Sequence, residues 1–376
     1  MKRRLTSLRR HLQASGVSAI LITHLPDLRW LSSFTGSSAA LVVTARQAML
    51  FTDGRYRAQA AAELVRSGVS FQIVDASPAR AAVLWASGQS EAASQAKQVG
   101  QPEAASLAYD AEQTTVAELD RLRTALPARL RRRFLVALPE SVVANLRMRK
   151  DADEIEIMAQ AAALGCSLFD HILGFLRPGL TEQSVAAELE HQARLRGAEG
   201  MSFETIVASG ARSSMPHGRA SSARLPRRGF LTLDFGVILR GYCSDMTRTV
   251  CFGQPTARER QVYDAVLAAQ QSGLASVRAG ATCEAVDQAA RSVLRQAGMA
   301  EAFSHSTGHG VGLQIHEAPR IAARQKAKLQ PGMVITIEPG AYFPGHFGVR
   351  IEDTVVVQRG GCRNLTAAAP TALIQL

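Results

Sequence analysis

The chain of 376 residues is poor in cysteine and in aromatic residues, and it contains no long uninterrupted apolar run. Its five cysteines are Cys166, Cys243, Cys251, Cys283 and Cys362. They include no Cys-x-x-Cys pair, and an odd number of cysteines cannot all be paired in disulfides. The cysteines therefore exclude a disulfide framework and favour a reducing compartment, the cytoplasm. No apolar run reaches the roughly 18 residues of a membrane span, so a membrane partner is not expected.

The sequence also lacks the motifs of several enzyme classes. There is no Gly-x-Ser-x-Gly elbow, "HEAPR" is not the zinc motif HExxH, and no cysteine lies in a recognisable nucleophile context. The tripeptide "DFG" at 234–236 is not accompanied by the glycine-rich loop, VAIK lysine or HRD motif of a kinase. Covalent catalysis is therefore not expected.

Positive charge is abundant, because the formal net charge is +11, but it comes mostly from scattered arginines. The only dense run, "RLRRR" at 129–133, has no interleaved aromatic residues, so a nucleic-acid partner is not expected. The N-terminal segment "MKRRLTSLRRHLQASG" contains no Asp or Glu and in this respect resembles a transit peptide. However, Leu5, Leu8 and Leu12 mark an amphipathic helix that leads into the strand "VSAILIT".

The length predicts two domains. Short apolar strands such as "VSAILIT", "AALVVTA", "QAMLFTD" and "VSFQIVD" alternate with helical segments over the first 140 or so residues, which indicates an α/β domain. A long helical pattern then begins with Asp151 as N-cap and Glu154 three residues later. We expect an α/β domain at residues 1–145 and a second domain at 146–376.

The stretch "LTLDFGVILRGYCSDMT" (231–247) predicts a β-hairpin with an aspartate in each arm, although strands usually exclude aspartate. If Leu239 and Arg240 form the turn, Asp234 and Asp245 lie directly opposite each other. Like charges so placed are destabilising unless a cation lies between them. The alternative is an offset turn that leaves one aspartate facing water.

The second domain contains an internal repeat. The segment "RPGLTEQSV" (177–185) matches "RAGATCEAV" (278–286), and "LTLDFG" (231–236) matches "ITIEPG" (335–340). Likewise "SDMT" (244–247) matches "IEDT" (351–354), so Asp234 corresponds to Glu338 and Asp245 to Glu352. Repeats of a helix pair plus a hairpin cannot bury their faces alone and are expected to pack around a pseudo-twofold axis. Four carboxylates then converge on that axis.

Four buried carboxylates need compensation, and two divalent ions supply it. Hard, oxygen-preferring ions in such pairs often add an imidazole ligand. His309, flanked by Gly308 and Gly310, is the candidate ligand, with His305 and His316 as candidates for supporting positions. For each of these histidines an ordinary hydrogen-bonded role is the alternative.

These motifs together, "DFG…YCSDMTRT", "HSTGHGVGLQIHEAP", "TIEPG" and "GVRIEDT", closely resemble the pita-bread-fold metallopeptidase family in its Xaa-Pro branch, proline dipeptidase and aminopeptidase P. The N-terminal "GVSAILITHLPDLRWLSSFTG" and "LFTDGRY" are similar to that branch's creatinase-type domain. The resemblance implies an α+β catalytic domain that holds two Mn²⁺, Co²⁺ or Zn²⁺ ions, Mn²⁺ foremost. The ligands it implies are Asp234, Asp245, His309, Glu338 and Glu352.

The implied activity is hydrolysis of Xaa-Pro bonds by a metal-bridging hydroxide. Glu338 is the expected proton acceptor. His217, in "SSMPHGRAS", and His316 are expected to donate hydrogen bonds to the oxygen that gains negative charge. Arg350 precedes Glu352 by two residues, hence on the same strand face, where it orients that carboxylate, contacts substrate or forms a structural ion pair.

Other functions are kept as alternatives. Methionine aminopeptidase shares the five ligands but normally lacks the N-terminal domain, and creatinase shares both domains but not the carboxylate set. A non-catalytic peptide- or nucleic-acid-binding protein on the same fold is the alternative outside enzymes. The motifs do not separate dipeptidase from aminopeptidase activity. A homodimer is the expected assembly, because twofold dimers are the commonest oligomers.

Overall fold

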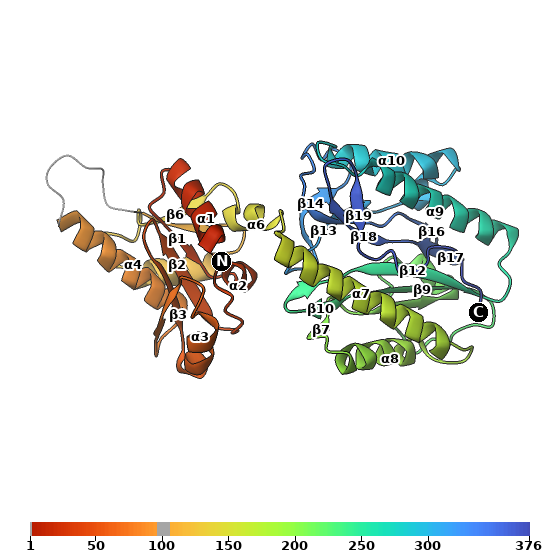
Figure 1. The fold of residues 1–376 in the computed structure, drawn as a ribbon, viewed down its shortest axis with the longest axis horizontal. Helices are drawn as coiled ribbons and strands as arrows, with labels where there is room; N and C mark the ends of the chain where they lie inside the picture. Colours follow the sequence, from red (N-terminus) through yellow and green to blue (C-terminus); the bar gives the residue numbers. More distant parts are fainter. Residues whose placement is uncertain (1, 96–105) are drawn as a thin grey trace. The chain divides into compact units, whose positions relative to one another are not determined.

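The computed structural model describes residues 2–95 and 106–376, and the chain divides into two compact units, Met1–Arg147 and Met148–Leu376. Figure 1 labels the helices and strands of both units. The boundary expected between residues 145 and 146 falls inside α6 (Val142–Arg147), the last helix of the first unit.

The first unit is an α/β domain built on one sheet. In chain order its elements are α1 (Lys2–Ala14), β1 (Ala19–Ile22), α2 (Leu25–Ser32), β2 (Ala39–Thr44), β3 (Ala48–Thr52), α3 (Arg57–Glu63), β4 (Ser70–Ile73), α4 (Pro78–Gln95), β5 (Leu107–Asp110), α5 (Val116–Ala125), β6 (Leu135–Leu138) and α6. The strand order is β4-β3-β2-β1-β5-β6. Parallel pairs (β1–β5, β5–β6 and β3–β4) occur beside the antiparallel pairs β1–β2 and β2–β3.

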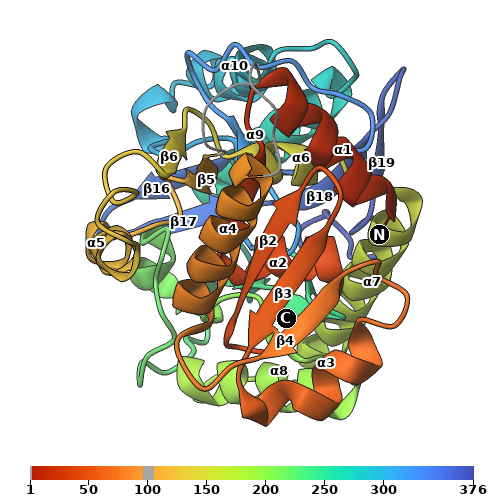
Figure 2. The same cartoon turned by 90° about the vertical axis from the view of Figure 1, so that its left-hand side faces the viewer.

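Helices of the first unit bury apolar faces against this sheet. Ala82 and Val83 of α4 belong to one buried cluster with Val42 of β2 and Phe51 of β3, and Figure 2 shows α4 running alongside these strands. The leucines predicted to mark the first helix, Leu5, Leu8 and Leu12, are all buried in α1. The predicted amphipathic helix is therefore confirmed.

The second unit places two helix pairs around its strands. In chain order its elements are α7 (Ala152–Phe175), α8 (Glu182–Leu195), β7 (Gly200–Met201), β8 (Ile206–Ser209), η2 (Gly210–Ser214), β9 (Gly229–Phe235), β10 (Val237–Leu239), β11 (Tyr242–Cys243), β12 (Met246–Phe252), α9 (Ala257–Ser276), α10 (Cys283–Gln296), β13 (Gly308–Gly310), β14 (Glu317–Ile321), β15 (Val334–Ile337), β16 (Gly340–Phe343), β17 (Phe347–Arg350), β18 (Asp353–Val357) and β19 (Cys362–Asn364). Figure 1 shows α7 and α8 on one side of the strands and α9 and α10 on the other.

The predicted internal repeat is confirmed by matching elements in the two halves of this unit. Helices α8 and α10 both follow a threonine N-cap, Thr181 and Thr282, whose side chain accepts a backbone hydrogen bond. Both are followed closely by a glycine with positive φ, Gly197 and Gly298. The strand order β12-β9-β8 in the first half matches β18-β15-β13 in the second.

Helix α7 begins where the sequence predicts, because Asp151 and Glu154 form the expected capping box. With 24 residues, α7 is long and apolar enough by length and composition to cross a membrane, although polar and charged residues interrupt its apolar run. Its Leu168, Phe169 and Ile172 are buried in the core of the second unit, so packing accounts for its apolar composition.

The hairpin that carries the two aspartates has a different register from the one predicted. Its turn is Arg240–Gly241, with φ of 48° and 82°, and Asp234 pairs with Thr247 instead of Asp245. Two positive φ angles match the type I′ turn, which suits tight hairpins and places glycine second. Neither aspartate faces water, because Asp234 is 8% exposed and Asp245 is 4% exposed. The predicted pairing of Asp234 with Asp245 is therefore wrong, and so is the alternative that one aspartate faces water.

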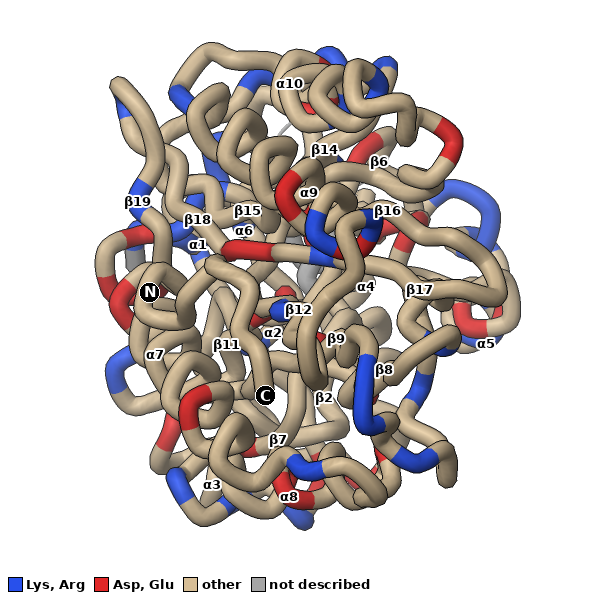
Figure 3. The backbone as a smooth tube through the Cα atoms, turned by 90° about the vertical axis from the view of Figure 1, so that its right-hand side faces the viewer, with Lys and Arg blue, Asp and Glu red and all other residues tan. Residues whose placement is uncertain are grey.

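Charged positions of both signs are spread along the second unit. In the view of Figure 3, Lys and Arg positions on helices and loops are interspersed with Asp and Glu positions. All five cysteines are free, and burial raises the pKa of the Cys166, Cys251 and Cys283 thiols. These thiols therefore stay protonated at neutral pH and pack as small apolar side chains.

Candidate metal centre

The second unit contains a cavity of about 740 Å³. It is lined by all five predicted metal ligands, Asp234, Asp245, His309, Glu338 and Glu352. The other predicted site residues, His217, His305, His316 and Arg350, line it as well. Residues from separate motifs thus meet on one concave surface, the usual setting of a small-molecule site.

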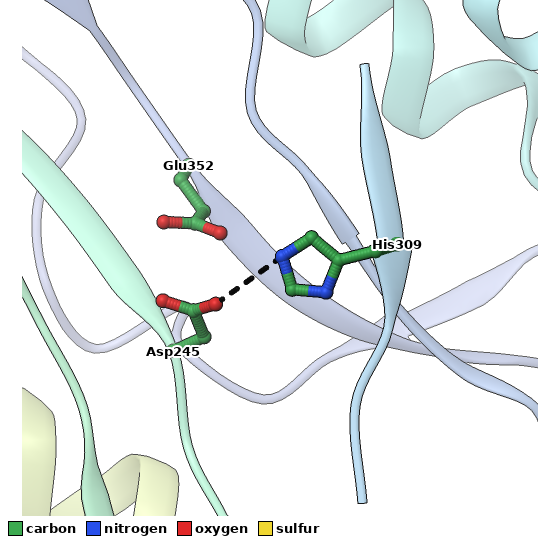
Figure 4. Close-up of side chains that lie close together, drawn as sticks. All are labelled: Asp245, His309 and Glu352. Atoms are coloured by element: carbon green, nitrogen blue, oxygen red, sulfur yellow. Dashed lines mark ion pairs between the residues drawn. The ribbon is translucent and has the colours of Figure 1, made fainter. Parts of the chain in front are cut away.

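The five predicted ligands come from both halves of the repeat. Asp234 lies in β9 and Asp245 directly precedes β12, whereas His309 lies in β13. Glu338 directly follows β15, and Glu352 lies between β17 and β18. Figure 4 shows the side chains of Asp245, His309 and Glu352 pointing toward one another. The matching strands of the repeat therefore deliver their acids to the same place.

The His309 ring links the acids. Its Nε2 atom lies 3.6 Å from Asp245 Oδ2 and 3.4 Å from Glu338 Oε1. Its Nδ1–H donates to the Gly310 carbonyl oxygen at 3.0 Å, which leaves the Nε2 lone pair facing the carboxylates, as in metal-binding histidines. One ligand atom from each of Asp245, His309 and Glu352 lies within 4.8 Å of the others.

Negative charge is crowded at this site. Burial raises the pKa of Asp245 and of Glu352 well above the usual range, and repulsion from neighbouring carboxylates raises both further. Burial also raises the pKa of Glu338 to about 7. These shifts have one physical meaning, which is that the surrounding protein does not supply enough positive charge to keep the acids ionised.

Asp234 has an oxygen that lacks a partner. Its Oδ2 accepts a hydrogen bond from Arg350 Nη2 at 2.5 Å, but its buried Oδ1 accepts none from the part of the chain that the structure describes. Such an orphaned buried oxygen is costly. A divalent cation would satisfy it and supply the missing charge, and a set of four carboxylates with one imidazole suits hard divalent ions.

Arg350 is buried and joins the two halves. Its guanidinium donates to Asp234, to the Thr247 hydroxyl at 3.1 Å and to the Tyr342 hydroxyl at 2.9 Å. The Thr247 hydroxyl in turn donates to Glu352 Oε2 at 2.8 Å. Of the roles weighed from the sequence, Arg350 therefore forms an ion pair with Asp234 and reaches Glu352 only through Thr247.

His305 lines the cavity, but both of its ring nitrogens are engaged. Nδ1 lies 2.8 Å from the Ser306 carbonyl oxygen, and Nε2 lies 2.8 Å from the Tyr342 hydroxyl. Burial lowers the pKa of His305 to about 4, and the charge of Arg350 lowers it further. His305 is therefore neutral at pH 7, with Nδ1–H donating to the carbonyl and Nε2 accepting from Tyr342.

His217 and His316 line the cavity as exposed residues. The rings of His316 and His309 have centroids 4.5 Å apart and meet edge to face at 75°. Burial lowers the pKa of His316, so it is neutral at pH 7 and retains one N–H donor. His217 lies shortly after η2, in the segment that connects β8 to β9.

Three residues that the structure brings to the site were missed from the sequence. Thr247 lies two residues after Asp245, hence on the same strand face, and this spacing could have identified it. Tyr342 carries no such local signal, because its partners Arg350 and His305 are set by the fold. Arg320 lines the cavity from β14 and also went unrecognised.

Comparison with known proteins decides the family. Residues 156–359 match the model of metallopeptidase family M24, which is more than half of the chain, and residues 4–149 match the creatinase/prolidase N-terminal domain. The chain belongs to metallopeptidase family M24. Membership confirms the predicted fold, a creatinase-type N-terminal domain followed by the pita-bread catalytic domain, and it implies divalent metal ions.

Relatives within family M24 identify the branch. The chain is 37% identical over 359 residues to an uncharacterised peptidase of Bacillus subtilis, with 96% of each chain covered. It is 41% identical over 227 residues to an Xaa-Pro dipeptidase of Pyrococcus furiosus, which covers 60% of this chain and 65% of the relative.

Solved structures of the family agree with this assignment. An Xaa-Pro dipeptidase from Bacillus anthracis superposes with a TM-score of 0.90 at 35% identity, covering 100% of this chain and 99% of that one. An X-Pro aminopeptidase from Thermotoga maritima gives a TM-score of 0.84 at 33% identity, covering 96% and 98%. The prediction of an Xaa-Pro peptidase, a hydrolase with peptide substrates, is therefore confirmed.

Proposed function

We propose that this peptidase is an Xaa-Pro dipeptidase whose site holds two divalent ions, Mn²⁺ foremost, with Co²⁺ and Zn²⁺ as alternatives. The proposed ligands are Asp234, Asp245, His309, Glu338 and Glu352. Two divalent ions match the four carboxylate charges, and the orphaned Asp234 Oδ1 gives one ion a ready donor. Bound ions of this kind lower the pKa of a water molecule to near neutrality and polarise a carbonyl oxygen.

The chain's own residues would then move protons and hold the substrate. Glu338 takes the proton of the attacking water and passes it to the nitrogen of the leaving proline. His217 and His316 donate hydrogen bonds to the oxygen that gains negative charge. Arg350 holds Asp234, while neutral His305 holds the Tyr342 hydroxyl that accepts from Arg350.

The observation that favours a dipeptide substrate is Arg320. Arg320 lines the cavity and is exposed, and no hydrogen bond or ion pair engages its guanidinium in the described part of the chain. The neighbouring cation Arg219 is instead paired with Glu204 at 2.8 Å. A free arginine at the cavity suits the terminal carboxylate of a dipeptide, which a longer peptide does not place there.

Three peptides test this proposal on protein loaded with Mn²⁺: Ala-Pro, Ala-Pro amide and Ala-Pro-Ala. We expect rapid cleavage of Ala-Pro and at least about tenfold lower kcat/KM for the other two, the size of one charge-assisted contact. Arg320→Ala should remove most of this preference, whereas Arg219→Ala, the matched control, should keep it. Cleavage of Ala-Pro-Ala as fast as Ala-Pro would make the protein an aminopeptidase instead. Cleavage of Met-Ala-Ser alone would contradict proline specificity.

We further propose a cytoplasmic homodimer. The free, mostly buried cysteines suit a reducing compartment, and twofold dimers are the commonest assemblies. Sedimentation equilibrium of the Mn²⁺-loaded protein should give twice the chain mass of 40.3 kDa, and a mass equal to one chain would contradict the dimer.

A further inference from the structure

Glu182 is a fully buried acid that has no part in the mechanism described above. It is the first residue of α8, with 0% of its surface exposed, and it lies outside the cavity lining. A carboxylate in the first turn of a helix is favoured by the helix dipole, but burial of its charge still requires several donors. The donors that Glu182 receives all come from one segment, residues 209–221.

The carboxylate of Glu182 joins the two ends of that segment. Oε1 accepts from the Ser209 backbone N–H at 2.8 Å and from the Ser209 hydroxyl at 2.9 Å. Oε2 accepts from the Ser221 backbone N–H at 3.0 Å and from the Ser221 hydroxyl at 2.6 Å. One side chain thus closes a loop of the main chain at its base.

Arg212 adds further hydrogen bonds along the same loop. Its Nε donates to Glu182 Oε2 at 3.0 Å, and its Nη2 donates to the Arg219 carbonyl oxygen at 2.7 Å. Nearer the cavity, Arg350 Nη1 donates to the Pro216 carbonyl oxygen at 3.0 Å. The backbone on both sides of His217 is therefore fixed by named bonds.

The His217 side chain itself has no such support. No hydrogen bond or ion pair reaches its ring from the described residues, and the residue is exposed. Its place at the cavity therefore depends on the backbone that carries it. Displacement of a catalytic group by about 1 Å can cost on the order of 100-fold in rate.

We propose that Glu182 is a positioning residue for His217, which acts by closing the segment 209–221 at its base. The inference rests on the proposed function, because it takes His217 as a donor to the reacting carbonyl oxygen. It adds a residue outside the cavity to those that determine the rate, and it predicts which catalytic group that residue serves.

The second half of the repeat offers a matched control. Asp287, in α10, is also fully buried and accepts from Arg291 Nη2 at 2.8 Å and from the Thr307 hydroxyl at 2.7 Å. Arg291 Nη2 also donates to the His305 carbonyl oxygen at 2.9 Å. Asp287 thus resembles Glu182 in burial and in its arginine partner, but it holds the segment that carries His305.

The test combines hydrogen exchange with a double-mutant cycle on the full-length, Mn²⁺-loaded protein. Glu182→Gln should raise amide exchange within 209–221 and leave 303–309 unchanged, while Asp287→Asn should do the reverse. With Ala-Pro as substrate, Glu182→Gln should lower kcat about 10- to 100-fold and leave KM within about twofold. In a His217→Ala background, Glu182→Gln should lower kcat by less than about twofold. The loss of kcat from Asp287→Asn should instead be the same with and without His217.

Equal losses from Glu182→Gln in the presence and absence of His217 would overturn the inference, as would a His217→Ala variant with unchanged kcat. Failure of the parent protein to cleave Ala-Pro would instead refute the proposed function. The exchange data would still show whether Glu182 holds the segment 209–221. If Glu182→Gln does not fold, Ser221→Ala replaces it in the cycle. This variant deletes only one donor and should show a smaller loss that likewise disappears in the His217→Ala background.

Discussion

The two halves of the catalytic unit share their architecture but not their chemistry. The first half contributes two aspartates, Asp234 and Asp245, and the second contributes the longer glutamates at the matching positions, Glu338 and Glu352. Only the second half adds an imidazole to the proposed ligand set, because the strand equivalent to β13 in the first half, β8 with the sequence IVAS, has no histidine. The halves are thus similar in fold, and the ligands that we propose for them are complementary.

Each half also holds a proposed ligand of the other half. Arg350 of the second half donates to Asp234, and Thr247 of the first half donates to Glu352. Thr354, the repeat equivalent of Thr247, donates to the Asp245 carbonyl oxygen at 2.8 Å. The site is therefore a property of the assembled pair of halves, which neither half could form alone.

Removal of metal should have the largest effect, because it removes what the two ligand sets share. Excess chelator should abolish cleavage of Ala-Pro, and added Mn²⁺ should restore it. The melting temperature should fall as well, since ligand binding stabilises the native state by mass action, by about 2.7 kcal/mol at a hundredfold excess over Kd. Full activity in chelator, with no metal found in the protein by elemental analysis, would contradict a metal centre.

Glu338→Gln against Asp234→Asn tests whether matching positions have different roles. Loss of general-base action typically costs about 10² to 10⁴ in rate, so Glu338→Gln should be nearly inactive at any metal concentration. Asp234→Asn should lose activity chiefly through metal affinity and recover part of it in excess Mn²⁺. Steady-state rates over a Mn²⁺ titration give both results, and rescue of Glu338→Gln to near the parent rate would reduce Glu338 to a ligand.

Thr247→Val compares the two halves through their hydroxyl contacts, and its expected effect is smaller. It keeps the side-chain shape but removes the hydroxyl that connects Arg350 to Glu352, and loss of such supporting bonds typically costs about 10- to 100-fold in metal affinity. Thr354→Val should cost less, because its hydroxyl bonds a backbone carbonyl and not a ligand carboxylate. Titration calorimetry with Mn²⁺ measures both, and Thr247→Ser should restore the affinity. Equal affinities for Thr247→Val and the parent would remove Thr247 from the site.

The pH dependence of the apo protein is the smallest expected effect. The pKa of Glu338 is about 7 in the folded chain against an ordinary value of 4.5, so the folded state binds its proton more tightly than the unfolded state. This contribution to stability is fully present below about pH 4.5 and is lost as the pH rises through 7. Differential scanning calorimetry should therefore show a larger fall in the apo melting temperature between pH 5 and 8 for the parent than for Glu338→Gln. Parallel curves would contradict the raised pKa.

The sequence could predict the acids but not the contacts between them. The repeat pairs Asp234 with Glu338 and Asp245 with Glu352, and the glycines on either side of His309 mark it as the candidate imidazole ligand. These signals can be read directly from the order of residues along the chain. The hairpin register escaped prediction, since the one-residue difference depends on the positive φ angles at Arg240 and Gly241.

The partner of Arg350 escaped prediction for a different reason. Its spacing from Glu352 pointed to that neighbour, whereas packing of the two halves places its guanidinium against Asp234. The role of Tyr342 depends on the same packing. Contacts between halves are long-range in sequence, so periodicity and spacing within one strand carry no record of them.

We propose that both halves together hold two metal ions. Anomalous diffraction at the manganese edge, from crystals of the Mn²⁺-loaded protein, tests it most directly. We expect two peaks about 3.5 to 4 Å apart in the cavity, with ligands from both halves around them: Asp234, Asp245, His309, Glu338 and Glu352. A single peak bound by the acids of one half, or no peak in the cavity of an active crystal, would contradict it.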